Sequence, residues 1–176
     1  MERTIETPLG NIILRPQKLE DVPFIEAYLF DSDPEFLESI GFKLSALGNR
    51  NDFRSKIENR IKNTTEGEVP VQIIAEFEGR AISHTWLEIG EGVQNAHFHI
   101  YEENLRGKGL GVLILKNAVE MLMDAHNVDE VYIEPKATNE RMIRLLKKCG
   151  FKNLGSSVYK NPQVGELEAI RFEVTT

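Results

Sequence analysis

The chain has 176 residues, of which 41% are hydrophobic and 28% are charged, and this balance predicts one soluble domain over residues 1–176. Its formal net charge of −7 argues against nucleic acid or an anionic membrane as the main partner, because both carry negative charge. The single cysteine, Cys149, excludes an intramolecular disulfide framework and a cysteine-rich zinc site.

The start of the chain carries no hydrophobic segment of the kind found in secretory signals. No stretch is long and apolar enough to span a bilayer. We therefore expect a cytoplasmic protein without a membrane partner.

The first third of the chain predicts one strand followed by about three helices. The strand covers residues 11–15 and ends at Pro16. A helix opens near Glu20, a short one follows Asp33, and a third covers residues 52–62, where apolar side chains recur every four residues.

The remainder predicts an antiparallel meander and then alternating helices and strands. Strands are expected at residues 71–77, 81–89, 94–101, 129–133, 151–159 and 167–174, with helices at 110–122 and 139–148. This order is typical of an α+β domain, with a mixed, mostly antiparallel sheet of about seven strands flanked by helices.

A glycine loop at residues 106–111, with the sequence RGKGLG, lies between a predicted strand and a predicted helix. Glycines allow a ligand to approach the backbone closely, and free N–H groups at a helix start bind anions. Arg106 and Lys108 add positive charge to an otherwise acidic chain. The loop therefore predicts a phosphate or pyrophosphate site.

Two common phosphate-binding loops do not fit. Lys108 is followed by Gly109, so the Ser or Thr that holds magnesium in a nucleotide-hydrolysing loop is missing. A dinucleotide fingerprint counted from Gly107 needs glycine where this chain has Val112.

Arg106, Gly109 and Gly111 fit the pattern [Q/R]-x-x-G-x-[G/A], and the loop resembles the acyl-CoA loop of the GNAT superfamily of N-acetyltransferases. The segment from Asn139 to Phe151 matches that family's N-x-x-A-x-x-L-Y-x-x-x-G-F helix in part. The opening residues 11–16 and 19–21 are similar to the branch that includes the ribosomal-protein N-terminal acetyltransferases.

The resemblance implies a sheet that splays between its fourth and fifth predicted strands, with acetyl-CoA entering there as co-substrate and no metal required. It implies backbone groups near Ile100 and Tyr101 that receive the pantetheine arm, one N–H of which faces the thioester oxygen. It assigns cofactor binding to Ile100, Tyr101, Arg106, Gly107, Lys108, Gly109, Leu110, Gly111 and Asn139. Asn139 equally fits a helix N-cap.

The chain departs from the family pattern at two positions of this helix. Leu146 stands where much of the family has the Tyr that protonates the leaving thiolate, and Met142 replaces a small residue. Three explanations fit the missing Tyr. Another acid replaces it, with Tyr159 as one candidate; the thiolate leaves without an acid; or the protein is a weak catalyst.

An acceptor pocket is predicted from alternate residues of two strands. His84, Trp86 and Glu88 share one face of the first strand, and His97, His99 and Tyr101 share one face of the next. If Ile89 pairs with Gln94, Trp86 faces His97 and His84 faces His99. We assign Glu88, His97 and His99 to catalysis, and His84 and Trp86 to substrate binding. A surface role for Glu88 and ordinary half-buried roles for His97 and His99 are the alternatives.

The sequence thus predicts an acetyl-CoA-dependent N-acetyltransferase. Its acceptor would be a primary amine on a small cationic metabolite, a protein N-terminus or a lysine, and a homodimer is possible. The alternative is a non-catalytic acyl-CoA-binding module with the same fold.

Overall fold

The computed structural model describes residues 1–65, 69–89, 94–161 and 165–175. In these ranges the chain forms one eight-stranded sheet in the order β1-β2-β3-β4-β5-β6-β8-β7. Every neighbouring pair is antiparallel except β5 and β6. The strands are β1 Arg3–Thr7, β2 Gly10–Pro16, β3 Gln72–Phe77, β4 Arg80–Glu88, β5 Asn95–Ile100, β6 Glu130–Ile133, β7 Lys152–Asn161 and β8 Gly165–Thr175.

The predicted α+β class is confirmed, and the predicted count of about seven strands is one too low. The additional strand is β1, which pairs with β2 from Thr7↔Gly10 to Arg3↔Leu14. Its sequence, RTIET, contains one apolar residue, Ile5, which packs against the core. A strand with a single apolar residue gives too weak an alternation to be recognised from sequence.

The predicted helices are present. They are α1 Val22–Phe30, α2 Pro34–Ser39, α3 Arg50–Thr65, α4 Leu110–His126 and α5 Glu140–Cys149, with short 3₁₀ turns at Leu19–Asp21, Leu44–Ala46 and Glu103–Leu105. The start of α2 is set by Asp33, whose Oδ1 accepts hydrogen bonds from the N–H groups of Glu35 and Phe36 at 2.7 and 3.2 Å. No helix in the described ranges is long and apolar enough to cross a bilayer.

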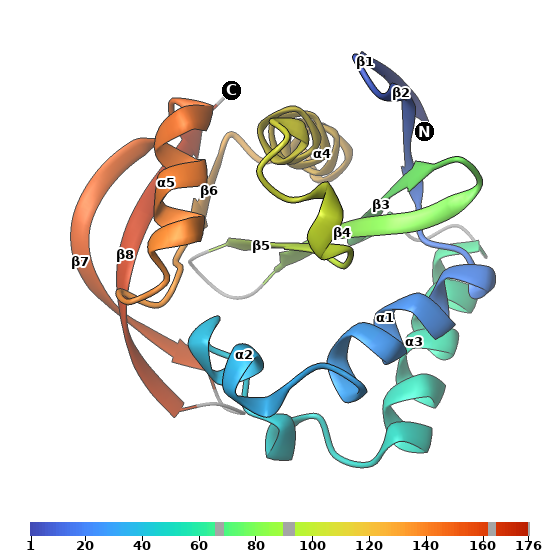
Figure 1. Cartoon of the computed structure of the whole chain (residues 1–176), viewed down its shortest axis with the longest axis horizontal. Helices are drawn as coiled ribbons and strands as arrows, with labels where there is room; N and C mark the ends of the chain where they lie inside the picture. The colour runs from blue at the N-terminus through green and yellow to red at the C-terminus, as the bar shows by residue number, and fades with distance from the viewer. Residues whose placement is uncertain (66–68, 90–93, 162–164, 176) are drawn as a thin grey trace.

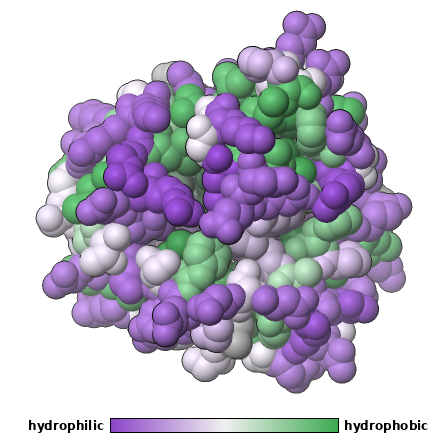
Figure 2. Space-filling view, in the orientation of Figure 1, coloured by the Kyte–Doolittle hydropathy of each residue, from purple (hydrophilic) through white to green (hydrophobic). Residues whose placement is uncertain are grey.

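The helices cover both faces of the sheet (Figure 1). On one face α4 packs over β1 to β5, and its side chains join those of the strands in the main core. On the other face α1 and α3 form a second core with Ile74 and Ala81. The outer surface in Figure 2 is mainly hydrophilic, with hydrophobic residues in small groups among the charged ones.

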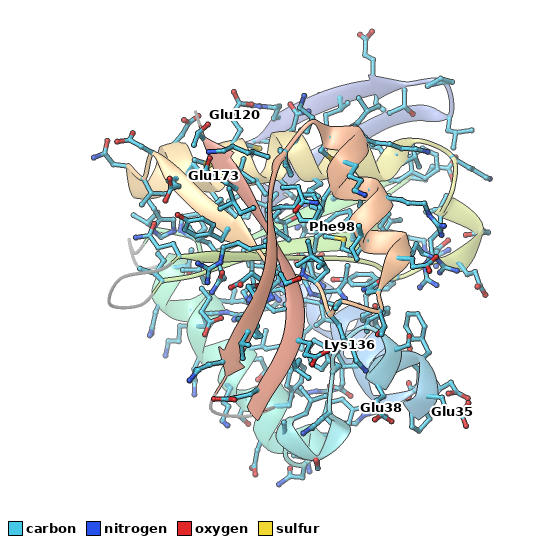
Figure 3. The ribbon with its side chains drawn as sticks, turned by 90° about the vertical axis from the view of Figure 1, so that its left-hand side faces the viewer. Glu35, Glu38, Phe98, Glu120, Lys136 and Glu173 are labelled. Carbon is cyan, nitrogen blue, oxygen red and sulfur yellow. The ribbon has the colours of Figure 1, made fainter. Side chains whose placement is uncertain are left out.

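The sheet splays between β5 and β6, which confirms the predicted break. Among the described residues, the two strands share one residue pair, Asn95↔Tyr132, and the Tyr132 N–H donates to the Gln94 carbonyl at 2.8 Å. A second link crosses the break near α2, because Lys136 Nζ donates to the Glu38 carbonyl at 3.0 Å (Figure 3). The two halves of the sheet therefore enclose a space that backbone pairing does not fill.

A buried ion pair fixes the entry into α1. Arg15 donates two hydrogen bonds to the Asp21 carboxylate, at 2.7 and 2.8 Å, and a third to Glu76 at 2.7 Å. Arg15 and Asp21 are 6% and 2% exposed, so both charges depend on each other for the hydrogen bonds that water would otherwise supply.

Asp21→Ala is expected to lower the free energy of unfolding by about 3–5 kcal/mol, because it leaves the buried Arg15 guanidinium without its main partner. Urea denaturation measures the change. The control is Glu166→Gln, which breaks the exposed Lys160–Glu166 pair at 2.9 Å and should cost less than about 1 kcal/mol. Equal losses in the two variants would contradict the assigned role.

Candidate functional site

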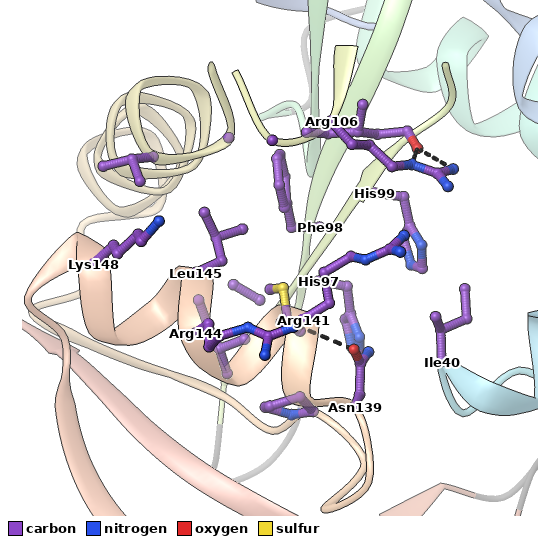
Figure 4. A pocket seen from close by; sticks show the side chains of 18 of the residues that line it. Ile40, His97, Phe98, His99, Arg106, Asn139, Arg141, Arg144, Leu145 and Lys148 are labelled. Carbon is purple, nitrogen blue, oxygen red and sulfur yellow. Dashed lines mark hydrogen bonds between the residues drawn. The ribbon is translucent and has the colours of Figure 1, made fainter. Parts of the chain in front are cut away.

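A cavity of about 600 Å³ lies where β5 and β6 part. Its walls come from the glycine loop, the open edge of β5, the loop after β6, and helices α1, α2 and α5. Figure 4 shows side chains from these separate elements converging on one space. The loop and two of the predicted catalytic residues, His97 and His99, line the same cavity.

The glycine loop has the backbone conformation that its sequence predicts. Gly107 and Gly109 have φ values of 78° and 81°, in the left-handed region that favours glycine. Gly109 is the N-cap of α4, so the first N–H groups of this helix start beside the cavity. A Cβ at Gly111 would lie 3.2 Å from Leu145 Cδ1, so this glycine permits the close approach of α4 and α5.

The other two loop positions differ in exposure. Lys108 is exposed, whereas the Leu110 side chain is 2% exposed and belongs to the core. Only the backbone of Leu110 is therefore available to a ligand.

The open edge of β5 is defined by alternation of its backbone groups. The Tyr101 N–H donates to the Ile82 carbonyl at 2.9 Å, so residues of that parity turn their N–H groups toward β4. By the same alternation, the N–H groups of Phe98 and Ile100 face the break. The expected pantetheine-facing N–H is therefore not that of Tyr101 but fits that of Ile100, and Phe98 is an additional residue at this edge that was not predicted.

Arg106 directs its side chain to the end of β5. Its Nη2 donates to the Ile100 carbonyl at 3.0 Å and to the Tyr101 carbonyl at 3.3 Å, as Figure 4 shows in part. Its guanidinium carbon also lies 5.1 Å from the centre of the Phe36 ring on α2.

Asn139 lines the cavity and caps α5, with Oδ1 accepting from the Met142 N–H at 3.1 Å. The N-cap alternative is therefore confirmed, and a contact to the cofactor arm stays a prediction. Leu146, at the position of the family's Tyr, is fully buried and does not line the cavity.

Three basic side chains of α5 line the cavity and were not predicted: Arg141, Arg144 and Lys148 (Figure 4). They are spaced by three and four residues and therefore share one helix face. This spacing was visible in the sequence, but it gains meaning only once the helix is placed beside the glycine loop.

The predicted register of the histidine strands is confirmed. His84 pairs with His99, and Trp86 pairs with His97. The Trp86 ring stacks on both His97 and His99, at centroid distances of 4.4 and 5.4 Å. The structure thus brings these four side chains together on the face of the sheet that α1 covers.

Two of the imidazoles are held in the neutral form. Burial lowers the pKa of His99 to about 3, and the charges of His97 and Arg106 act in the same direction. Burial also lowers the pKa of His84 well below its ordinary value. His99 Nδ1 lies 3.1 Å from the Tyr28 hydroxyl, and His84 Nδ1 lies 2.6 Å from the Tyr101 hydroxyl.

Glu88 links His97 to Tyr159. His97 Nε2 lies 3.2 Å from Glu88 Oε2, and the Tyr159 hydroxyl donates to the same oxygen at 2.9 Å. The His97 hydrogen bond is the main cause that lowers the pKa of Glu88, and the Tyr159 bond adds to it against an opposing effect of burial. Glu88 is therefore an ionised acceptor that orients its neighbours.

Known proteins resemble this chain in sequence. The family model of an acetyltransferase (GNAT) domain matches residues 64–157. An N-alpha-acetyltransferase of Sulfolobus acidocaldarius is 29% identical over 93 residues, covering 46% of this chain and 55% of that protein. A kanamycin resistance protein of Rhizobium radiobacter is 30% identical over 69 residues, covering 39% of this chain and 64% of that protein. The match thus spans less than two thirds of either relative.

Solved structures share the fold over nearly the whole chain. RimJ of Mycobacterium smegmatis, in complex with CoA-disulfide, has a TM-score of 0.74 at 13% identity, covering 99% of this chain and 87% of that one. The ribosomal-protein-S5-alanine acetyltransferase of Vibrio fischeri has a TM-score of 0.73 at 14% identity, covering 98% and 96%. The aminoglycoside acetyltransferase AAC(6')-Ib, with coenzyme A and kanamycin, has a TM-score of 0.65 at 21% identity, covering 93% and 94%.

The free energy of unfolding should fall as the pH falls below about 6.5. His99 and His84 then take up protons in the unfolded chain, but they stay neutral while they are buried in the folded protein. The folded pKa of His99 lies below its unfolded value, so its contribution is complete above about pH 6.5 and is lost on acidification. Each such histidine adds a slope approaching 1.4 kcal/mol per pH unit, roughly. Urea denaturation between about pH 7 and pH 5 should show a shallower slope for His99→Gln, and parallel curves would contradict this assignment.

Proposed function

This chain belongs to the GNAT acetyltransferase family, and on that premise we propose that it transfers an acetyl group from acetyl-CoA to a primary amine. One observation carries the proposal: the glycine loop, the open edge of β5 and the His97 side chain line one cavity. Such a cavity serves an acyl-transfer reaction because it holds both reactants together and excludes water.

The residues at the break fit the chemistry of the co-substrate. The loop and the start of α4 offer backbone N–H groups and a positive helix end to a pyrophosphate. The N–H groups of Phe98 and Ile100 offer fixed dipoles to a thioester oxygen. The cavity wall also carries positive charge for the phosphate of CoA that lies outside the pyrophosphate; it comes from Arg141, Arg144 and Lys148. Acetyl-CoA supplies the activated acyl group.

His97 is the base in this proposal, and Glu88 positions it. Its imidazole borders the cavity, and Nε2 is held by the Glu88 carboxylate, which leaves Nδ1 for the proton of the acceptor amine. His99 remains neutral and is better suited to hydrogen bonding than to removing a proton. His84 and Trp86 form the wall behind these two rings.

The acceptor is an amine on a small cationic molecule, a protein N-terminus or a lysine. The N-alpha-acetyltransferase and kanamycin-resistance relatives support this range without choosing within it. The second candidate is a CoA-binding module without turnover. It is favoured by Leu146, because a buried leucine occupies the position where the family places its acid.

Release of free CoA thiol from acetyl-CoA tests the two candidates against a panel of peptides, aminoglycosides, polyamines and amino acids. Amine-dependent release is expected, and His97→Gln should lower kcat/KM by about 100-fold, with Glu88→Gln losing about tenfold. His126→Gln is the control, since His126 lies at the end of α4 with Nε2 3.0 Å from the Pro70 carbonyl. A protein-only blank accounts for the Cys149 thiol. CoA binding without any amine-dependent release would favour the module.

The basic face of α5 is tested separately by CoA binding. Lys148→Gln should raise the Kd for CoA by about three- to tenfold, with a weaker salt dependence, because it removes a charge from the cavity wall. Lys147→Gln is the matched control, because Lys147 is the adjacent, exposed residue and does not line the cavity. Titration calorimetry measures both, and equal effects of the two substitutions would reject the assignment.

A further inference from the structure

The side chain of Arg106 makes its contacts outside the glycine loop. It is 18% exposed, and both Nε and Nη2 donate to the Ile100 carbonyl, at 3.3 and 3.0 Å. Nη2 also reaches the Tyr101 carbonyl at 3.3 Å. The guanidinium therefore closes the end of β5, where the strand has lost its neighbour.

The same guanidinium lies over the ring of Phe36 on α2, with its carbon 5.1 Å from the ring centre. Phe36 packs edge-on against Tyr28, with ring centroids 6.2 Å apart. The Tyr28 hydroxyl lies 3.1 Å from His99 Nδ1, and Tyr28 is 7% exposed. An unbroken series of contacts thus leads from the first residue of the loop to an imidazole in the cavity wall.

Helix α2 is held at its other end by the opposite half of the sheet. Lys136, which follows β6, donates to the Glu38 carbonyl at 3.0 Å. Asp33 caps the start of the helix. With Arg106 on one side and Lys136 on the other, this short helix spans the break in the sheet, and Phe36 lies between Arg106 and Tyr28.

We propose that Arg106 is a positioning residue for the acceptor wall, which it sets through Phe36 and Tyr28, and that it is not a ligand of the pyrophosphate. The proposal rests on the proposed function for its kinetic consequence. It assigns Arg106 a role that differs from the cofactor contact implied by the loop motif. The loop then binds the cofactor through its backbone, while its first side chain sets the geometry of the other substrate.

The charge of Arg106 reaches the same two residues. Burial raises the pKa of Tyr28 to about 12, against an opposing effect of the Arg106 charge. For His99, burial is the main cause of the lowered pKa, and the charges of His97 and Arg106 add to it. Arg106 therefore acts on Tyr28 and His99 by charge as well as through Phe36.

Two substitutions test the proposal: Arg106→Lys keeps the charge but loses the guanidinium over the ring and its forked hydrogen bonds, and Phe36→Leu removes the ring. Each should raise the KM for the acceptor about tenfold while changing the Kd for CoA less than about threefold. The double variant should raise the acceptor KM by less than the product of the two single effects, because both substitutions break the same contact between Arg106 and Phe36. Circular dichroism and melting temperature confirm that each variant is folded.

The matched control is Arg80→Lys, an exposed arginine paired with Glu102 at 2.8 Å near the same strand end and outside the cavity. It should change neither constant. A raised Kd for CoA in Arg106→Lys, with an unchanged acceptor KM, would show that Arg106 is a ligand of the pyrophosphate and overturn the proposal.

A readout without turnover separates this proposal from the proposed function. The His99 ring resonances, followed by NMR in the free protein, should shift in both Arg106→Lys and Phe36→Leu and stay in place in Arg80→Lys. Unchanged resonances in both variants would overturn the positioning role even if no acceptor is acetylated. Failure of wild-type protein to bind CoA would instead count against the proposed function alone.

Discussion

The structure depends on the parting of β5 and β6, which share one residue pair in the part of the chain that the structure describes. Backbone N–H and C=O groups need partners, and β5 loses its partner beyond Asn95↔Tyr132. One of these groups finds a partner inside the chain, because the Arg106 guanidinium donates a hydrogen bond to the Ile100 carbonyl. The N–H groups of the same edge remain directed into a cavity of about 600 Å³. A polar edge beside a helix start is a ready site for a ligand with a carbonyl and phosphates.

Strand β5 also separates two chemical environments. Phe98 and Ala96 belong to the main core beneath α4, whereas on the other face His99 contacts Tyr28 of α1 and His97 contacts Trp86 and Tyr159. Successive side chains of β5 point to opposite faces of the sheet. The strand therefore presents its backbone to the cavity, apolar side chains to the main core and imidazoles to the other face. Burial against Tyr28 and Trp86 keeps His99 neutral, while the Glu88 carboxylate holds His97 at the rim. Two imidazoles that lie only two residues apart in the sequence thus have different surroundings.

Much of the fold and part of the site follow from local patterns. The glycine loop was recognisable because its glycines and basic residues lie between a predicted strand and a predicted helix. The β4–β5 register followed from assuming that Ile89 pairs with Gln94, and the observed Trp86↔His97 pair agrees with it. Strand β1 was missed because only Ile5 marks its buried face. The position of three basic residues at the cavity was missed because a basic helix face is ordinary until a neighbouring cavity is known; they are Arg141, Arg144 and Lys148.

The sequence by itself determined the order of the elements after β1, the glycine loop that has left-handed glycines at 107 and 109, and the alternation that groups the histidines. These depend on backbone geometry over a few residues, which the local sequence controls. Only the tertiary structure decided that Arg106 meets Phe36, that Tyr28 meets His99, and that Leu146 is buried in the core. Each of these facts depends on how elements distant in the chain pack together, because a long side chain takes the partner that packing places within its reach.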